Sequence, residues 1–257
     1  MTVLPVMRVL LPLSALLVSS CTALAAPSAS ASHKFQLKYF DIRGAAEGAR
    51  LLLALAGEEY DDARYGLTPG KMESPTFDAA KEAGELVTNL DRAPVLITPE
   101  GVAIGQSKAI ERFLAKQFGF MGTTNVEAAL IDCIAEHCRD VKDAQTRKRF
   151  SAFVKDRTDE DKARAQREWF EDDLPAMLAK VEAAVGAGDA SNGCAVGKAI
   201  SYADVAIYSL LKECFPAYRE ATLLAAKDCP LLLEICDTVA NNPKIKEWVE
   251  KRPESMM

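Results

Sequence analysis

The fold is decided by the stretch FQLKYFDIRG, residues 35–44. Apolar and polar side chains alternate from Phe35 to Phe40, and this period of two predicts a short strand. A leucine-rich stretch follows and ends at Gly57, so residues 45–57 are expected to form a helix that stops at the glycine. A strand that leads directly into a helix begins a β-α-β unit.

Two further stretches complete this first domain. They read NLDRAPVLIT, residues 89–98, and GVAIGQSKAIERFL, residues 101–114. Residues 59–65 suit a second strand, and the Pro-Glu-Gly turn at 99–101 predicts a hairpin. Ser107 is expected to cap the helix that comes next. The order β-α-β followed by β-β-α predicts a thioredoxin-like domain.

The second half of the chain shows helical patterns only. The segment ISYADV, residues 200–205, carries Ser201 and Asp204 at the spacing of a capping box, in which each residue satisfies the backbone N–H of the other. The glycine-containing stretch 119–124 is expected to be a linker. The predicted organisation is therefore a leader at 1–32, an α/β thioredoxin-like domain at 33–118, the linker at 119–124, and an all-α helical bundle at 125–257.

Length and composition fit this division. The chain has 257 residues, 49% of them hydrophobic, and a net charge of −6. Two domains of roughly 100–200 residues each can be built from such a chain. The acidic balance, with no basic run, argues against nucleic acid or an anionic membrane as a partner. It does not exclude a small anionic ligand, which needs only a local positive potential.

The leader has the composition of a targeting segment. Arg8 precedes an apolar run at 9–18, and Ala-Leu-Ala at 23–25 is a small-x-small cleavage pattern. We expect a signal peptide, hence the secretory pathway, the extracellular space or the periplasm, with no membrane attachment after cleavage. Two other destinations of the protein remain as alternatives. VSSC at 18–21 resembles a lipoprotein box, and the Ser/Ala-rich tail of the leader resembles two-part plastid leaders.

Seven cysteines and two histidines are present. No C-x-x-C pair occurs and no Cys/His group has metal-ligand spacing, which argues against a dithiol redox pair and a zinc site. We expect the six cysteines beyond the leader to serve mainly as buried apolar side chains, although an oxidising compartment would permit disulfides.

The three stretches at 35–44, 89–98 and 101–114, in this order and spacing, resemble the glutathione-binding half of the cytosolic glutathione transferases. The Tyr39-Phe40 pair is most similar to the sigma class, which includes the glutathione-dependent prostaglandin D synthases. The capping box and the tail at 242–253 also resemble this family, so the likeness covers about residues 35 to 253. It implies glutathione as cosubstrate, no metal, and a homodimer.

The resemblance implies a role for Tyr39 as the catalytic residue. Glutathione's thiol, near the cysteine reference pKa of about 8.5, is mostly protonated at neutral pH. A hydroxyl donor directed at the sulfur stabilises the thiolate selectively. Tyr39 matches the family's tyrosine with this task, where the chain leaves the first strand.

The same resemblance implies the remaining glutathione contacts. Pro94 matches a cis-proline that exposes the backbone of Ala93 to the cysteinyl unit, while Gln106 and Ser107 match the pair that holds the γ-glutamyl end. Further glutathione contacts are expected from Phe40, Lys81, Arg92 and Asp140. Walls of the electrophile pocket are expected from Ile42, Gly44 and Arg139.

Two departures from the prostaglandin synthase pattern narrow the function. Arg139 stands where that branch has an acidic residue for a divalent cation, so no metal activation is expected. Ala45 replaces a basic residue at the mouth of the electrophile pocket, which makes prostaglandin synthesis less favoured. The leading hypothesis is a glutathione transferase that conjugates glutathione to a small hydrophobic electrophile. A non-catalytic binding or structural protein and a glutathione-dependent isomerase remain as alternatives. A cysteine-based enzyme is disfavoured because the strand ends in Tyr39 rather than cysteine.

Overall fold

The computed structural model describes residues 34–68, 71, 73–151, 154–188 and 190–255. The predicted leader lies outside these residues, and so do the expectations on cleavage and destination that depend on it.

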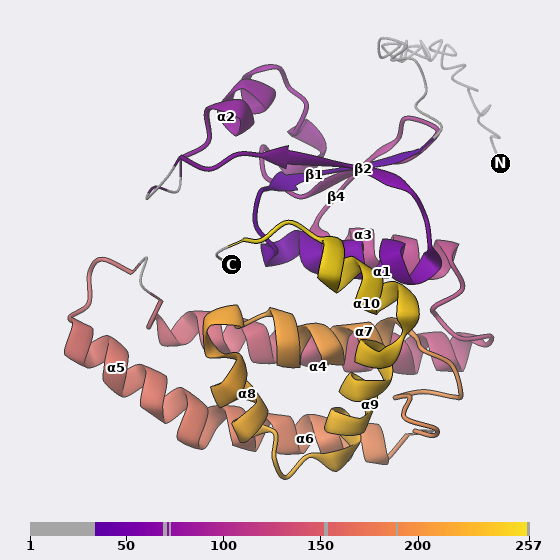
Figure 1. Cartoon of the computed structure of the whole chain (residues 1–257), viewed down its shortest axis with the longest axis vertical. Helices are drawn as coiled ribbons and strands as arrows, with labels where there is room; N and C mark the ends of the chain where they lie inside the picture. The colour runs from indigo at the N-terminus through magenta and orange to yellow at the C-terminus, as the bar shows by residue number, and fades with distance from the viewer. Residues whose placement is uncertain (1–33, 69–70, 72, 152–153, 189, 256–257) are drawn as a thin grey trace, which may run out of the picture. The chain divides into compact units, whose positions relative to one another are not determined.

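The N-terminal domain is a four-stranded mixed sheet with helices on both faces (Figure 1). The strand order is β2-β1-β3-β4, with β1 parallel to β2 and antiparallel to β3, which pairs antiparallel with β4. Its elements are β1 Phe35–Phe40, η1 Gly44–Ala46, α1 Glu47–Ala56, β2 Tyr60–Tyr65, α2 Pro75–Glu82, η2 Val87–Asn89, β3 Val95–Ile97, β4 Ala103–Gly105 and α3 Ser107–Gln117. This confirms the predicted α/β domain.

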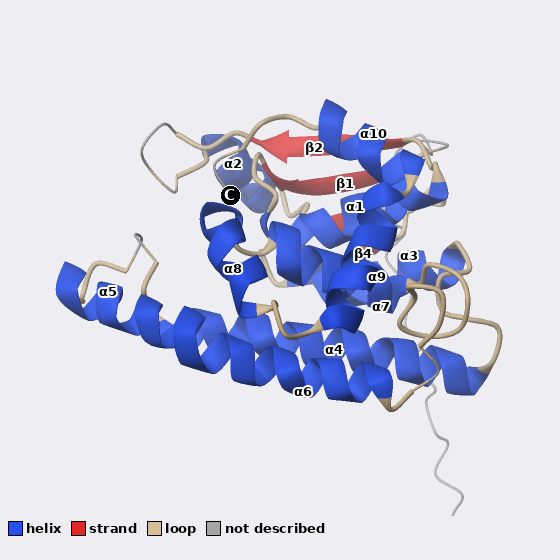
Figure 2. Ribbon diagram, turned by 60° about the horizontal axis from the view of Figure 1, so that its bottom comes forward, coloured by secondary structure: helices blue, strands red, loops and turns tan. Residues whose placement is uncertain are grey.

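The C-terminal domain is built from helices, and among its described residues β pairing is limited to two isolated bridges, Ala190–Gly197 and Ser191–Cys194. Its elements are α4 Asn125–Lys148, α5 Asp159–Glu168, η3 Trp169–Asp173, α6 Leu174–Gly186, α7 Tyr202–Tyr208, η4 Ser209–Glu213, η5 Pro216–Tyr218, α8 Arg219–Ala225, α9 Pro230–Asn241 and α10 Pro243–Lys251. A π-helical turn, η3, joins α5 to α6, and the three form one long rod beside α4 (Figure 2). This confirms the predicted all-α half.

Helices α1 and α3 lie between the sheet and the helical domain (Figure 1). The alternation predicted for β1 is observed, because Phe35, Leu37 and Tyr39 are buried while the residues between them are partly exposed. A single cluster of buried side chains runs from the sheet through α1 and α3 into α4 and α7. The two domains therefore share one hydrophobic core, in which α1 packs against α3 of its own domain and against α7 and α10 of the helical domain.

A buried ionic network also joins the domains. Arg252, just after α10, lies 2.6 Å from Glu47 on α1 and 3.0 Å from Glu213 on η4. Arg43, in the loop that leads into α1, reaches Glu213 at 3.2 Å. Trp248 of α10 donates its indole N–H to Glu47 at 3.0 Å. Buried charges require such pairing, since an isolated one is strongly disfavoured.

The structure confirms the predicted start of one helix, α7, and shifts the start of another, α3, by one residue. The capping box of α7 forms as expected, and the Asp204 carboxylate accepts from the Ser201 N–H at 2.7 Å and from the Ala195 N–H at 2.6 Å. Ser107 was expected to be the cap of α3, but it is the first helical residue. The cap position belongs to Gln106, whose side chain makes no capping hydrogen bond.

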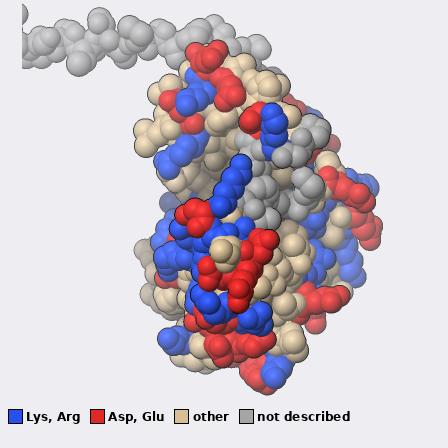
Figure 3. Space-filling view, turned by 90° about the vertical axis from the view of Figure 1, so that its left-hand side faces the viewer, with Lys and Arg blue, Asp and Glu red and all other residues tan. Residues whose placement is uncertain are grey.

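No helix among the described residues is both long and apolar enough to cross a bilayer. On the face shown in Figure 3, basic and acidic side chains are interspersed.

Candidate functional site

Tyr39 stands at the end of β1 with its hydroxyl at the start of the next helical turn. Its side chain is 8% exposed. The hydroxyl oxygen accepts a hydrogen bond from the Ala45 N–H at 3.0 Å. The guanidinium carbon of the fully buried Arg50 lies 5.9 Å from the centre of the tyrosine ring. The oxygen is thus held as an acceptor, which leaves its own proton free to donate.

Gly44 allows this close approach of backbone and phenol. Its φ is +44°, and a Cβ atom built on it would lie 2.6 Å from the Tyr39 hydroxyl oxygen. Glycine adopts such a conformation without steric cost. Any side chain here would compete with the hydroxyl for the same space.

A cis peptide bond joins Ala93 to Pro94 directly before β3, as the family resemblance implied. The loop that carries it is held by Asn89, which is 4% exposed. The side-chain N–H groups of Asn89 donate to the carbonyls of Pro94 at 2.9 Å and Arg92 at 3.1 Å. Its carbonyl oxygen accepts from the Gln106 N–H at 3.0 Å. One buried amide therefore connects the cis-proline loop to the start of α3.

Gln106 itself has a φ of +67°. For a residue with a Cβ this conformation is strained, and such strain is commonly found at functional sites. Ser107 follows as the first residue of α3, so its N–H belongs to a helix N-terminus, where anionic groups are favoured.

The other residues predicted to contact glutathione differ in how exposed their side chains are. Phe40 is half-buried and packs against Phe77 with ring centres 4.8 Å apart. Lys81, Arg92 and Asp140 have exposed side chains.

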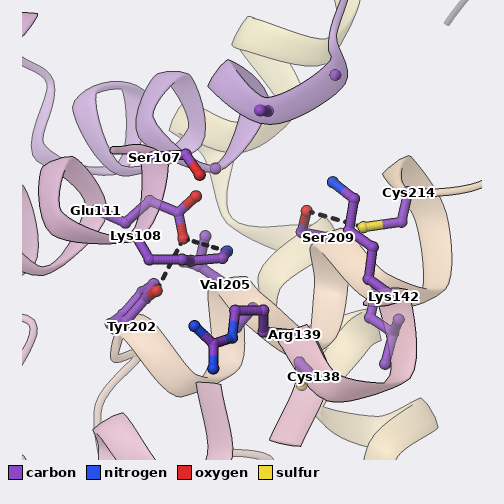
Figure 4. A pocket seen from close by; sticks show the side chains of 15 residues that line it. Ser107, Lys108, Glu111, Cys138, Arg139, Lys142, Tyr202, Val205, Ser209 and Cys214 are labelled. Carbon is purple, nitrogen blue, oxygen red and sulfur yellow. Dashed lines mark hydrogen bonds and ion pairs between the residues drawn. The ribbon is translucent and has the colours of Figure 1, made fainter. Parts of the chain in front are cut away.

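A cavity lies between the two domains (Figure 4). Tyr39 is not part of its lining, but the Tyr39 hydroxyl contacts Ala45, which is. The cavity is formed by the start of α1, the first turn of α3, the middle of α4, and α7 with η4. Two of the three predicted pocket residues, Gly44 and Arg139, line it together with Ser107. The third, Ile42, is buried in the core, where its carbonyl accepts from Arg50 at 2.7 Å.

The polar groups of this cavity are largely paired. The Glu111 carboxylate, 3% exposed, lies 2.6 Å from Lys108 and accepts from the Tyr202 hydroxyl at 2.8 Å. Burial, and then the nearby Glu111 charge, raise the pKa of Tyr202 well above its ordinary value. Arg139 lies 2.7 Å from Glu136.

Three residues of the site were missed by the sequence interpretation. Asn89 was quoted within its segment but given no role, since its partners are a loop and a helix start that only the fold brings together. Lys108 and Lys142 also line the cavity. A signal for Lys142 existed, because it stands four residues after the buried Cys138 and therefore on the inner side of α4.

The six cysteines among the described residues form no disulfide bond. All six are free, four of them buried, while Cys133 is exposed and Cys214 half-buried. No cluster of three or more potential ligands suited to a metal ion occurs among the residues that the structure describes.

Comparison with known proteins places this geometry in a family. The family model described as "Glutathione S-transferase, N-terminal domain" matches residues 35–116. The model described as "Glutathione S-transferase, C-terminal domain" matches residues 144–252.

Individual relatives cover nearly the whole chain beyond the leader. Glutathione S-transferase 3 of Caenorhabditis elegans is 29% identical over 221 residues, which cover 86% of this chain and 98% of that protein. Hematopoietic prostaglandin D synthase of Gallus gallus is 30% identical over 222 residues, with 86% and 98% covered. The solved structure of a sigma class glutathione transferase from Fasciola hepatica matches with a TM-score of 0.66 at 26% identity, covering 86% of this chain and 98% of that one.

These matches agree with the predicted sigma-like resemblance and with the observed fold. The chain belongs to the glutathione S-transferase family and is a glutathione transferase.

Proposed function

We propose that this protein conjugates the thiolate of glutathione to a small hydrophobic electrophile, with Tyr39 as the residue that stabilises the thiolate. The observation that carries the proposal is the state of the Tyr39 hydroxyl. Its oxygen accepts from the Ala45 N–H, so its hydrogen is free to be donated to the sulfur of a bound glutathione. Helix polarity at the start of η1 and α1 favours negative charge at the same place.

Glutathione would lie along the cis-proline loop and the first turn of α3. The backbone of Ala93 would pair with the cysteinyl unit, and Gln106 with Ser107 would hold the γ-glutamyl end. Phe40, Lys81, Arg92 and Asp140 stay proposed contacts from the family resemblance.

The reaction needs positioning and charge stabilisation. The thiol proton leaves to solvent, the sulfur lone pair forms a C–S bond with the electrophilic carbon, and the displaced electron pair departs with a leaving group or is protonated on the substrate. A hydrogen bond from Tyr39 acts on the anion that exists before the attack.

The test is a titration of the thiolate absorbance of bound glutathione against pH, on protein without the leader. The wild type should lower the pKa of the thiol by about one unit or more, each unit being worth about 1.4 kcal/mol. Tyr39→Phe should return this pKa to the value of free glutathione with little loss of binding. Tyr60→Phe is the matched control, because the buried Tyr60 hydroxyl has no hydrogen-bond partner among the described residues.

Binding without a pKa change in the wild type would favour the non-catalytic alternative. Absence of glutathione binding would contradict the proposed glutathione site altogether.

Two further parts of the proposal concern assembly and location. We propose a homodimer, supported by the exposed apolar side chains of Val126 and Leu130, one turn apart on α4. We also propose export, on the pattern of the leader, and a role in detoxification, which the family resemblance implies.

A further inference from the structure

Lys142 differs from the other cations that line the cavity between the two domains. Lys108 is paired with Glu111 at 2.6 Å and Arg139 with Glu136 at 2.7 Å. The ammonium group of Lys142 forms neither an ion pair nor a hydrogen bond with any residue that the structure describes, although the backbone carbonyl of Lys142 accepts from the Thr146 hydroxyl at 3.1 Å. Lys142 is nevertheless half-buried, so its ammonium group has given up part of its hydration without gaining a carboxylate as a direct partner.

The side chain of Lys142 extends from α4 into the same cavity, whose lining also includes the hydrogen-bonded pair Ser209 and Cys214 (Figure 4). Cys214 is the main group that raises its pKa. Burial lowers this pKa, while Glu111, Tyr39 and Asp143 raise it further, and the sum is an increase. Lys142 is therefore charged at neutral pH.

The cavity has an excess of positive charge. Its lining contains three basic side chains and one carboxylate, and that carboxylate, Glu111, is occupied by Lys108 and the Tyr202 hydroxyl. Apolar groups of Val205, Ala206 and Leu210 line the same cavity. A ligand that matches this lining has an apolar body and an anionic group.

We infer that Lys142 is a specificity-determining residue that binds a carboxylate on the electrophile, so that the substrates of this transferase are apolar electrophiles with one carboxylate group. A single ammonium suits a singly charged carboxylate, whereas a phosphate dianion would call for several fixed donors. The kinetic test of this inference rests on the proposed conjugation reaction. The binding of the carboxylate can be measured without any reaction.

The kinetic test uses two electrophiles that differ only in charge, 4-(3-oxobut-1-enyl)benzoate and its methyl ester. Glutathione thiolate adds to the carbon β to the ketone, the C–S bond forms, and the resulting enolate takes a proton from water. Lys142→Met should lower kcat/KM for the carboxylate by about tenfold or more, since tenfold corresponds to about 1.4 kcal/mol. The same variant should change kcat/KM for the ester by less than about twofold, a small effect on this scale.

Two further variants serve as controls. Lys142→Arg keeps the charge and should retain most of the preference for the carboxylate. Lys180→Met removes an exposed lysine on α6 by the same substitution and should leave both substrates unaffected. An equal loss for carboxylate and ester in Lys142→Met would overturn the inference. So would a raised pKa of the bound glutathione thiol in that variant, because Lys142 would then act on glutathione.

A binding experiment separates this inference from the proposed function. The saturated ketones, 4-(3-oxobutyl)benzoate and its methyl ester, cannot react and are titrated calorimetrically in the presence of S-methylglutathione. Tighter binding of the carboxylate by the wild type, lost in Lys142→Met, supports the inference even if the protein has no transferase activity. Equal binding of the two compounds by the wild type rejects it even if the enzyme is active.

Discussion

At the scale of single residues, the site depends on how closely atoms approach the Tyr39 hydroxyl. Its oxygen is fixed by the Ala45 N–H, and Gly44 leaves just enough room for the phenol. Proximity of this kind is worth far more to a reaction than the energy of the contact itself, because displacement of a catalytic group by about 1 Å can cost about a hundredfold in rate.

Gly44→Ala should therefore impair chemistry more than folding. The added methyl group would lie 2.6 Å from the Tyr39 oxygen, so the ring must move. We expect kcat/KM to fall by about a hundredfold with a much smaller change in the dissociation constant of glutathione, measured by steady-state kinetics and calorimetry.

Gly101→Ala is the comparison for Gly44→Ala. Gly101 also has a positive φ, +82°, but no atom lies within 4 Å of its built Cβ. That variant should lose some stability and keep its activity. Equal activity losses in the two variants would show that backbone strain, rather than the clash with Tyr39, is responsible.

At the scale of elements, Asn89 holds two segments together that the sequence separates. Its side chain bonds the cis-proline loop before β3 and the residue that precedes α3. The Cβ of a residue at 105 would lie 2.7 Å from Asn89, so Gly105 lets β4 pass close to this amide. The proposed cysteinyl and γ-glutamyl contacts thus share one support.

Asn89→Ala should weaken both stability and glutathione binding. Two carbonyls and one N–H lose their partner in a buried place, and each such loss costs about 1–3 kcal/mol. Urea unfolding and calorimetric titration with glutathione measure the two effects. Asn241→Ala, at an exposed position on α9, should change neither. Unchanged glutathione affinity in a folded Asn89→Ala protein would contradict the supporting role.

The elements were largely predictable, because their signals are local. The alternation in 35–40, the Pro-Glu-Gly hairpin turn and the Ser201–Asp204 box each depend on a few neighbouring residues. The start of α3 was placed one residue off, because the strained Gln106 occupies the cap position. The roles of Asn89 and Lys142 were not predicted, since the link from Asn89 to Gln106 and the cavity around Lys142 are formed by elements distant in sequence.

At the scale of the whole molecule, one network of ion pairs connects the two domains. Arg252 is 8% exposed in its side chain and contacts Glu47 and Glu213, carboxylates that belong to different domains. Arg43 joins the same group from the loop between β1 and α1. The loop that positions the residues around Tyr39 is therefore tied to the end of the helical domain.

Arg252→Met should destabilise the protein by about 3 kcal/mol, the lower part of the range for breaking a buried ion pair. Glu47 and Glu213 each keep another basic neighbour, so the loss is not complete. Urea unfolding followed by far-UV circular dichroism measures the change. The double variant Glu47→Gln, Arg252→Met should recover part of the lost stability, because it leaves fewer unpaired charges. Lys251→Met, which removes an exposed ion pair with Glu247, should have no measurable effect.

The contact between Glu47 and Arg252 also sets an order of events during protein synthesis. The two residues are 205 positions apart, and Arg252 follows the last helix. The ribosome therefore produces the first domain and nearly all of the second while Glu47 still lacks this counterion. A chain that stops before residue 252 should be less stable than the full one, because Glu47 and Glu213 would then lack Arg252 as a partner. Both ion pairs of Arg252, with Glu47 and with Glu213, can thus form only after translation has run through the described helices of both domains.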